Sequence, residues 1–300
     1  MAGSIRGCAM SEARALGLGP MPARPGVRRL RQNRAAVAAA VVLAALVLLA
    51  IFGTWLSPYS YDALDWQHLA VPPGLTASHW LGTDPLGRDL YVRTLYGLRL
   101  SLLIGVLATA VSVGIGVAWG AIAGYVGGRT DSWMMRTVDV LYALPYLFVV
   151  IILATVFGRG RVAMLLLAIG AVGWLTMARV VRGQTLSLKR REFIEAARAT
   201  GLGTAAILLR HIVPNLAGTV AVYATLTVPE LISYESFLSF LGLGVQEPLA
   251  SLGSLINDGA RQMLTVPWML LVPAGALFTL LLCFNVLGDG LRDALDPAAH

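Results

Sequence analysis

Residues 35–56 read AAVAAAVVLAALVLLAIFGTWL and contain no charged side chain. As an α-helix this stretch would extend about 33 Å, which matches the roughly 30 Å hydrocarbon core of a bilayer. A cleavable secretory signal has a shorter apolar region, of about 7 to 15 residues. The stretch therefore predicts an uncleaved first helix that spans a membrane.

The rest of the chain continues this pattern. Of its 300 residues 57% are hydrophobic and only 13% are charged, whereas soluble domains have about 25% charged residues. Five more apolar runs are bounded by charges or turn residues, which predicts an all-α membrane protein with six transmembrane helices in one domain, 35–300. The expected spans are 35–56, 101–125, 138–157, 162–181, 216–243 and 268–287. Residues 1–34 are Arg-rich and predict a disordered tail.

The distribution of positive charge predicts the orientation. If both termini are cytoplasmic, the outer segments hold only six of the 23 Lys and Arg residues, as membrane insertion favours. The long inner loop is then 182–215, and a long outer segment follows the first span. The net charge of +7 is explained by this topology rather than by nucleic acid, because the basic residues do not gather on one periodic face.

The sequence lacks the residues that nucleotide hydrolysis, metal binding and intramembrane proteolysis would require. The only lysine is Lys189, so the chain has no phosphate-binding P-loop, which requires a Gly-Lys-Ser or Gly-Lys-Thr sequence. The four histidines are separated in the sequence, and we expect neither a metal site nor a bound cofactor. An intramembrane protease would need paired catalytic groups, and Asp289, which is predicted to end the last span, has no second buried aspartate to pair with. We therefore expect no catalytic residue.

The inner loop is the most informative hydrophilic segment. Residues 192–215 read EFIEAARATGLGTAAILLRHIVPN. The first half favours a short helix, with Arg191 and Glu195 spaced as an ion pair and Gly201 as its C-terminal cap. After a break, Thr204 is expected to cap a second short helix that ends near residue 210. Pro214 then marks the return into the membrane.

The side chains of this loop predict a docking element. Ala196, Ala197 and Ala199 would leave a smooth surface, and Phe193 and Ile194 would supply apolar anchors. The same composition also fits an amphipathic helix that lies on the inner leaflet and is held there by its arginines. The physical pattern favours the two readings equally.

The spacing within this loop resembles the EAA loop of permease subunits of binding-protein-dependent ABC importers. The pattern is Glu-Ala-Ala, a glycine after three further residues, and a proline after a fixed interval. His211 and Val213 depart from the general pattern, where isoleucine and leucine are usual, and the ending is similar to that of peptide importers. The residues that carry this likeness are Glu195, Ala196, Ala197, Arg198, Gly201, His211, Pro214 and Asn215.

Further motifs resemble the dipeptide, oligopeptide and nickel branch of these permeases. LGTDPLGRD at 81–89 is similar to an outer motif of that branch, and LSFLGLG at 238–244 to one near the end of a late span. A Gly-Gly to proline series at 127–145 and the segment 285–297 also match in order. The resemblance thus covers about 35–297. The charged residues of the outer motif and its second glycine are Asp84, Gly87, Arg88 and Asp89.

The resemblance implies a type I ABC importer permease fold in a bacterial cytoplasmic membrane. It also implies a second permease subunit in a pseudo-symmetric heterodimer, two ATPase domains that bind ATP and Mg²⁺, and an extracytoplasmic binding protein that delivers a peptide. The inner loop would sit in a groove of an ATPase and convert its closure into rocking of the membrane helices. The outer motif would contact the binding protein or brace the first two spans, with pairing of Asp84 with Arg88 or of Asp89 with Arg93 if the stretch is helical.

Two acidic residues in the fifth span are candidates for the translocation pathway. Glu230 follows Pro229, which we expect to interrupt the helix and expose backbone groups, and Glu235 lies five residues further on. Each carboxylate is equally consistent with a structural role, satisfied by Tyr234, Ser236 or a residue of the sister subunit. The alternative function is an ion-coupled secondary transporter that needs no ATP, and this would leave the inner loop without a role.

Overall fold

The computed structural model describes residues 32–74, 78–156 and 162–295, so the expected disordered tail lies almost wholly outside the described residues. The described chain is helical, and its only β-pairing is an isolated bridge. In chain order the elements are α3 (Arg34–Phe52), η1 (Gly53–Leu56), α4 (Leu90–Val126), α5 (Gly128–Ala143), α6 (Tyr146–Val156), α7 (Val162–Leu188), α8 (Glu192–Ala199), α9 (Thr204–Ile207), the π-helical turn η2 (Leu208–Ile212), α10 (Val213–Phe240), α11 (Leu252–Arg261) and α12 (Trp268–Leu295).

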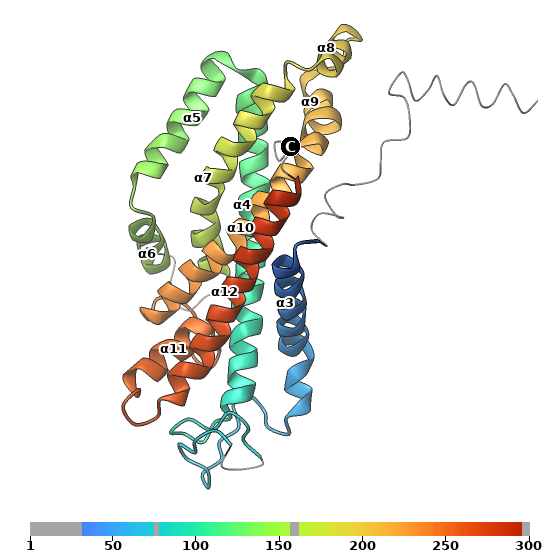
Figure 1. The fold of residues 1–300 in the computed structure, drawn as a ribbon. Helices are drawn as coiled ribbons and strands as arrows, with labels where there is room; N and C mark the ends of the chain where they lie inside the picture. The colour runs from blue at the N-terminus through green and yellow to red at the C-terminus, as the bar shows by residue number, and fades with distance from the viewer. Residues whose placement is uncertain (1–31, 75–77, 157–161, 296–300) are drawn as a thin grey trace, which may run out of the picture.

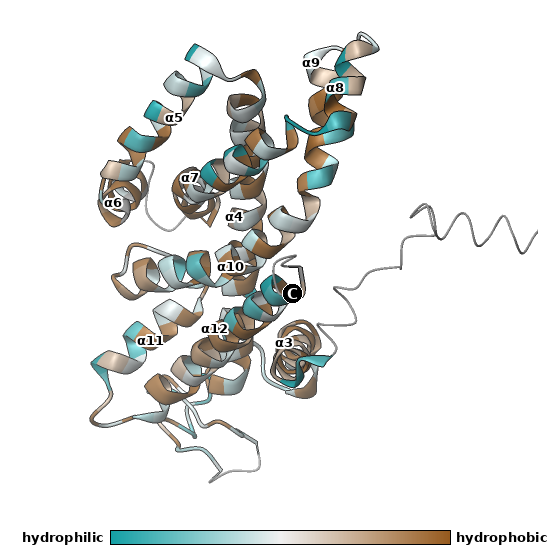
Figure 2. Cartoon of the chain, turned by 45° about the horizontal axis from the view of Figure 1, so that its top comes forward, coloured by the Kyte–Doolittle hydropathy of each residue, from teal (hydrophilic) through white to brown (hydrophobic). Residues whose placement is uncertain are grey.

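The long helices form one bundle and alternate in direction (Figure 1). Five of them are long and apolar enough to cross a membrane, and a sixth crossing is possible if α5 and α6 count as one bent span. The loop before α4, which the charge distribution predicts to be the outer loop, lies at one end of the bundle, and α8 and α9 lie at the other. α3 runs toward the loop end and α12 runs away from it. Polar residues gather on α5 and around α8, whereas α3 is almost entirely apolar (Figure 2).

Close approach of α4 to α7 forms the centre of the bundle. Gly116, Gly120 and Gly124 recur every four residues along one side of α4 and face α7. A Cβ atom built on Gly120 would lie 2.4 Å from the carbonyl oxygen of Ala178 on α7, which is closer than such atoms can come. The glycine stripe therefore lets the two backbones touch.

α4, α7 and α12 extend beyond the spans expected from hydropathy, and α12 does so at its end, which is Leu295 rather than position 287. α4 begins eleven residues before position 101. Hydropathy leaves out these first turns because they hold charged residues, and the fold provides partners for those charges. Arg93 is buried, and its guanidinium lies 5.4 Å from the centre of the Tyr61 ring and 3.8 Å from Glu247. α7 continues past position 181 to Leu188, and Arg182 forms a bidentate ion pair with Asp131 of α5 at 2.5 and 2.6 Å.

The expected span 138–157 is not one helix. α5 ends at Ala143 and α6 begins at Tyr146, with a bend of 89° between them. Leu144 has an extended backbone (φ −76°, ψ 135°), as the residue before a proline prefers, and Pro145 follows it. α5 is also amphipathic and largely exposed. It is tied to α7 by ion pairs and by its buried Val138, which packs with Leu175 and Ala178.

The expected interruption of α10 at Pro229 is wrong. α10 passes through this residue without a break. Neighbouring hydroxyl groups bond to carbonyls of the helix: Ser233 donates to the carbonyl of Pro229 at 2.8 Å, and Thr227 donates to that of Tyr223 at 2.8 Å. Such side chains let a proline stay inside a membrane helix.

Candidate functional sites

One side of α8 is held firmly against the bundle. Ile194 is fully buried and Ala197 is nearly so, and both belong to an apolar cluster that includes Ile212. Arg198 adds a polar link, because its Nε donates a 3.2 Å hydrogen bond to the hydroxyl of Tyr125 at the end of α4. α8 is therefore packed against the end of α4 and against the turn that leads into α10.

The opposite side of α8 is exposed. Glu195 and Ala196 lie there, and Phe193 is 42% exposed. Phe193 thus fits the expected role of an outward anchor, but Ile194 does not, because it packs into its own bundle. The expected ion pair between Arg191 and Glu195 does not form among the described residues, which leaves the Glu195 carboxylate open to another partner.

The end of α8 confirms the cap expected from the sequence. Gly201 has φ +80°, a left-handed backbone conformation that residues other than glycine rarely adopt. Its N–H donates to the carbonyl of Arg198 at 2.9 Å, and the next N–H, that of Leu202, donates to the carbonyl of Ala197 at 3.3 Å. These two bonds define a Schellman motif, which fixes the direction in which the chain leaves α8.

The second half of the loop differs from the expectation. Thr204 is the first residue of α9 and not its cap, since Gly203 occupies the N-cap position. The chain then runs as one continuous helix from Thr204 to Phe240. Pro214 does not break it, because it lies in the first turn of α10 after the wider π-helical turn. His211 belongs to that turn, and the Asn215 side chain donates to its carbonyl at 2.6 Å.

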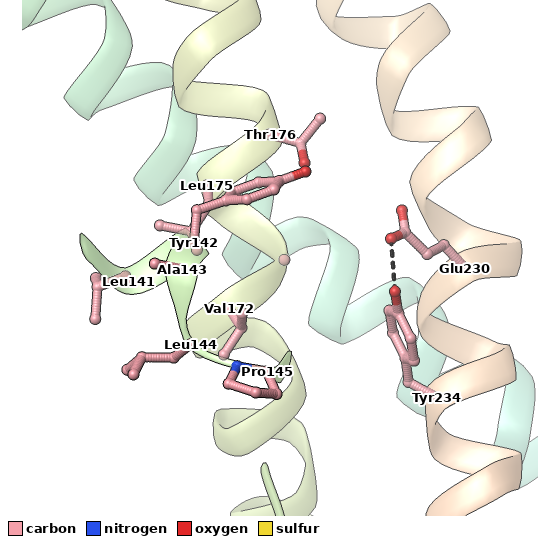
Figure 3. A pocket seen from close by; sticks show the side chains of 11 residues that line it. Leu141, Tyr142, Ala143, Leu144, Pro145, Val172, Leu175, Thr176, Glu230 and Tyr234 are labelled. Atoms are coloured by element: carbon pink, nitrogen blue, oxygen red, sulfur yellow. Dashed lines mark hydrogen bonds between the residues drawn. The ribbon is translucent and has the colours of Figure 1, made fainter. Parts of the chain in front are cut away.

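A cavity of about 380 Å³ lies between α10 on one side and α7 with the bend of α5 and α6 on the other (Figure 3). Figure 3 shows Glu230 and Tyr234 extending from α10 toward Tyr142 and Thr176 across it. The Tyr234 hydroxyl donates a 3.0 Å hydrogen bond to the Glu230 carboxylate. The walls are otherwise mainly apolar, so this carboxylate is the acidic group of the cavity.

Glu235 has a different environment. It is fully buried, and its carboxylate accepts hydrogen bonds from Ser239 at 2.7 Å, Ser101 of α4 at 2.8 Å and Ser236 at 3.3 Å. The Ser101 hydroxyl in turn accepts the N–H of Leu252 at the start of α11. Glu235 is absent from the lining of the cavity that contains Glu230. The sequence left open a structural role for Glu235 and a role in the translocation pathway, and these contacts support the structural role.

The outer motif folds as a clamp rather than a helix. The Asp84 carboxylate accepts the backbone N–H groups of Leu86 and Arg88, both at 2.9 Å, and it pairs with the Arg88 side chain at 2.6 Å. Arg88 also reaches Glu247, in the loop between α10 and α11, at 2.9 Å. Gly87 has φ +76° and lies against the backbone of Asp65. The motif thus braces two distant parts of the outer end.

Asp89 does not pair with Arg93, as a helical stretch would have allowed. It is the N-cap of α4, where one oxygen accepts the N–H of Val92 at 2.9 Å. Its other oxygen contacts Nδ1 of His79 at 2.8 Å. The ring of His79 lies 5.5 Å from that of His68, so the separation of these two histidines in the sequence does not persist in the fold.

Sequence reasoning missed several residues that hold these sites together. Tyr125, Ser101 and Glu247 carry few local signals, because their partners are between 73 and 159 residues away. The glycine stripe of α4 was visible in the sequence as a repeat of small residues every four positions.

Comparison with known proteins identifies the family. The model of the binding-protein-dependent transport system inner membrane component matches residues 116–300, and that of the N-terminal membrane domain of oligopeptide transport permease C matches residues 23–73. The chain belongs to the binding-protein-dependent transport permeases. The permease is thus a multi-pass protein of the bacterial inner membrane, as its helices also indicate.

Curated relatives resemble the permease over most of their length. It is 53% identical to an oligopeptide transport system permease protein of Escherichia coli K12, over 90% of this chain and 89% of that protein. It is 52% identical to the corresponding protein of Haemophilus influenzae, over 90% and 86%. A dipeptide transport system permease protein of Bacillus subtilis is 47% identical over 90% of this chain and 84% of its own.

Proposed function

We propose that this permease is the membrane-spanning subunit of an ATP-driven ABC importer that takes up peptides of the oligopeptide or dipeptide class. The names of its relatives support the substrate class, and membership of the permease family supports the importer. The structural observation that carries the proposal is the exposed face of α8 on a rigidly held helix. The comparisons give no support to an ion-coupled secondary transporter.

The family implies partnership with ATPase and substrate-binding subunits. In the finer assembly that we propose, this chain pairs with a second permease in a pseudo-symmetric heterodimer, two ATPase domains dock beneath them, and an extracytoplasmic binding protein delivers the peptide. ATP and Mg²⁺ belong to the ATPase domains, since this chain has no P-loop. It has no catalytic residue or cofactor of its own in this scheme, and membrane lipid surrounds its apolar helices.

The proposed orientation places α8, α9 and both chain ends in the cytoplasm. The basic residues near α8 support this, because positive charge favours the cytoplasmic side. α4 has 37 residues and is about 55 Å long, so one end must project beyond the roughly 30 Å core of the bilayer. The turns of α4 outside the expected span 101–125 are residues 90–100, which hold Arg93 and Arg99, so we place that projection at the end opposite α8.

In the proposed mechanism α8 transmits the ATPase movement. Glu195 and Ala196 would contact the ATPase, and the anchors on the other side, Ile194 and Arg198, would carry its displacement into α10 and α4. Because α8 lies between α7 and α10, a rigid-body shift would reach both sides of the cavity at once. His211, Pro214 and Asn215 would serve by making the link from α9 to α10 helical and therefore stiff.

We assign the cavity that contains Glu230 to the translocation pathway. A carboxylate in a largely apolar cavity attracts a cation, and a peptide carries one at its free amino terminus. The Glu230→Gln variant should therefore lower uptake of a peptide with a free amino terminus and leave uptake of the same peptide after N-acetylation unchanged. An equal loss for both peptides would count against this assignment.

The function itself is tested by uptake in proteoliposomes. The complex is purified in mild detergent with its natural partners and reconstituted. It should import labelled peptide when ATP and Mg²⁺ are supplied on the side of the membrane that carries the ATPase domains. Replacement of ATP by a non-hydrolysable analogue should abolish uptake. Uptake that follows a proton or sodium gradient without ATP would establish the secondary transporter instead.

A further inference from the structure

We propose that the outer loop binds a borderline divalent cation such as Zn²⁺ between Asp65, His68 and His79. The three ligand atoms, one from each residue, all lie within 4.8 Å of one another. Two imidazole nitrogens and one carboxylate oxygen are a ligand set that suits Zn²⁺, and a water molecule would complete a tetrahedral site. This site is separate from α8 and from the cavity that contains Glu230.

The distances fit a tetrahedral ion. Oδ2 of Asp65 lies 2.9 Å from Nδ1 of His68 and 3.4 Å from Nε2 of His79. Ligand bonds of about 2.0 to 2.1 Å in a tetrahedron place neighbouring ligand atoms about 3.3 Å apart. The two histidine nitrogens lie within 4.8 Å of each other, and a bound ion would draw them toward that spacing.

The second ring nitrogen of His79 is arranged as it is in known zinc sites. Its Nδ1 lies 2.8 Å from Oδ2 of Asp89. A carboxylate at this position fixes the tautomer with the proton on Nδ1, so the lone pair of Nε2 faces Asp65 and His68. The other oxygen of Asp89 accepts the N–H of Val92. The proposed ion would therefore be connected to the N-terminus of α4 through one carboxylate.

The surrounding loop holds the ligands in place. The His79 ring is stacked on that of Tyr59, with 4.3 Å between centroids. Oδ1 of Asp65 accepts the N–H of Gln67, which leaves Oδ2 to face the histidines. The carbonyl of His68 accepts the hydroxyl of Thr83 at 2.6 Å. These contacts, none of which involves the ion, hold the ring of His79, the backbone of His68 and one oxygen of Asp65.

The site is open to solvent on one side only. The side chain of His79 is fully buried, whereas those of His68 and Asp65 are 34% and 25% exposed. An ion can therefore enter from the outer face. Once bound it would tie residues 65–68 to residue 79 and to the start of α4, and so stiffen the outer loop beside the clamp formed by Asp84 and Arg88.

The test measures zinc directly and does not depend on transport. The full chain is purified in detergent through an affinity tag without histidines, and EDTA removes any bound metal. It is then dialysed against Zn²⁺ and afterwards against metal-free buffer. Mass spectrometry measures the zinc that remains per chain. We expect about one zinc in the wild type and a loss of that zinc in His68→Ala. Asp62→Ala is the matched control, because Asp62 is in the same loop but bonds only to Ser60 among the described residues, and it should retain the zinc.

A second variant tests the role of Asp89. Asp89→Asn keeps a good N-cap for α4 but loses the carboxylate that orients His79, so zinc affinity should fall by about 10 to 100-fold while the melting temperature without metal stays the same. Zinc bound equally by the wild type and His68→Ala would overturn the proposal. So would a wild type that keeps no zinc, since the cluster would then be a hydrogen-bonded brace only.

Discussion

The hydroxyl of Ser101 on α4 donates a 2.8 Å hydrogen bond to the carboxylate of Glu235 on α10, at a point where both side chains are fully buried. Ser239 donates to the same carboxylate from one turn further along α10. A buried carboxylate is stable only when such donors surround it. The bond therefore joins two membrane helices at one fixed height, and it makes Glu235 part of the framework rather than of the pathway.

Removal of this carboxylate should destabilise the bundle. In Glu235→Ala the hydroxyl of Ser101 loses its buried acceptor and a void remains, which we expect to cost about 2 to 3 kcal/mol. Glu235→Gln keeps an acceptor of the same shape and should cost less. The measurement is the melting temperature of the permease in detergent. Glu230→Ala, on the exposed side of the same helix, is the control. Equal melting temperatures for Glu235→Ala and this control would contradict the framework role.

The glycine stripe of α4 gives a second prediction. A methyl group at Gly120 would collide with the carbonyl of Ala178, so Gly120→Ala should push α7 away and cost about 1 to 3 kcal/mol. Gly114 lies on the same helix with open space around it, and Gly114→Ala should be neutral or slightly stabilising. Thermal unfolding of the two variants, compared side by side, checks this contrast. Similar effects of both would show that α4 and α7 do not pack as described.

The cap of α8 gives a third prediction. Gly201→Ser places a side chain in a left-handed conformation and should cost about 1 kcal/mol in the turn after α8. Gly203 has φ −68° and tolerates other residues, so Gly203→Ser is a matched control two positions away. We expect limited proteolysis to cut the 199–204 segment faster in Gly201→Ser only. Equal cleavage of the two variants would remove the special role of Gly201.

The pair formed by Arg88 and Glu247 should depend on pH. The hydrogen bond from Arg88 holds the pKa of Glu247 below its usual value of 4.5. A carboxylate whose pKa is lowered by folding contributes stability above its unfolded pKa and loses it as the pH falls through the folded value. Because the Glu247 side chain is 65% exposed, the contribution should be below about 1 kcal/mol.

The comparison with Glu247→Gln measures this contribution. The wild type should melt slightly higher than the variant at neutral pH, and the difference should vanish as the pH is lowered below 4.5. A difference that grows on acidification would mean that the sign of the interaction has been misjudged.

Local signals in the sequence were sufficient for the bundle and for α8. A long uncharged run such as 35–56 indicates a membrane span, and a glycine after EAARAT indicates the end of a helix. Both signals are carried by residues that are neighbours in the sequence. The exact start of α4 was not predictable in this way. Hydropathy excludes its first turns because of Arg93, and only the folded outer loop provides Tyr61 and Glu247 to satisfy that charge.

The outer cluster shows the same limit more clearly. Asp65, His68 and His79 have no metal-ligand spacing in the sequence, and only the turn around Gly87 and the bridge between Thr83 and Asp89 bring them together. The bend between α5 and α6 is an intermediate case. Pro145 was visible as a potential break, but the apolar residues on both sides of it favoured a single span.

The most direct test of the account is the number of peptides imported for each ATP hydrolysed by the reconstituted complex. Glu195→Lys reverses the charge of the exposed residue that we place at the ATPase contact. We expect this ratio to fall at least tenfold, with the ATPase itself still active. Asp293→Lys, an equal charge reversal at the exposed end of α12, should leave the ratio unchanged. A wild-type ratio in Glu195→Lys would contradict the assignment of α8 as the coupling helix.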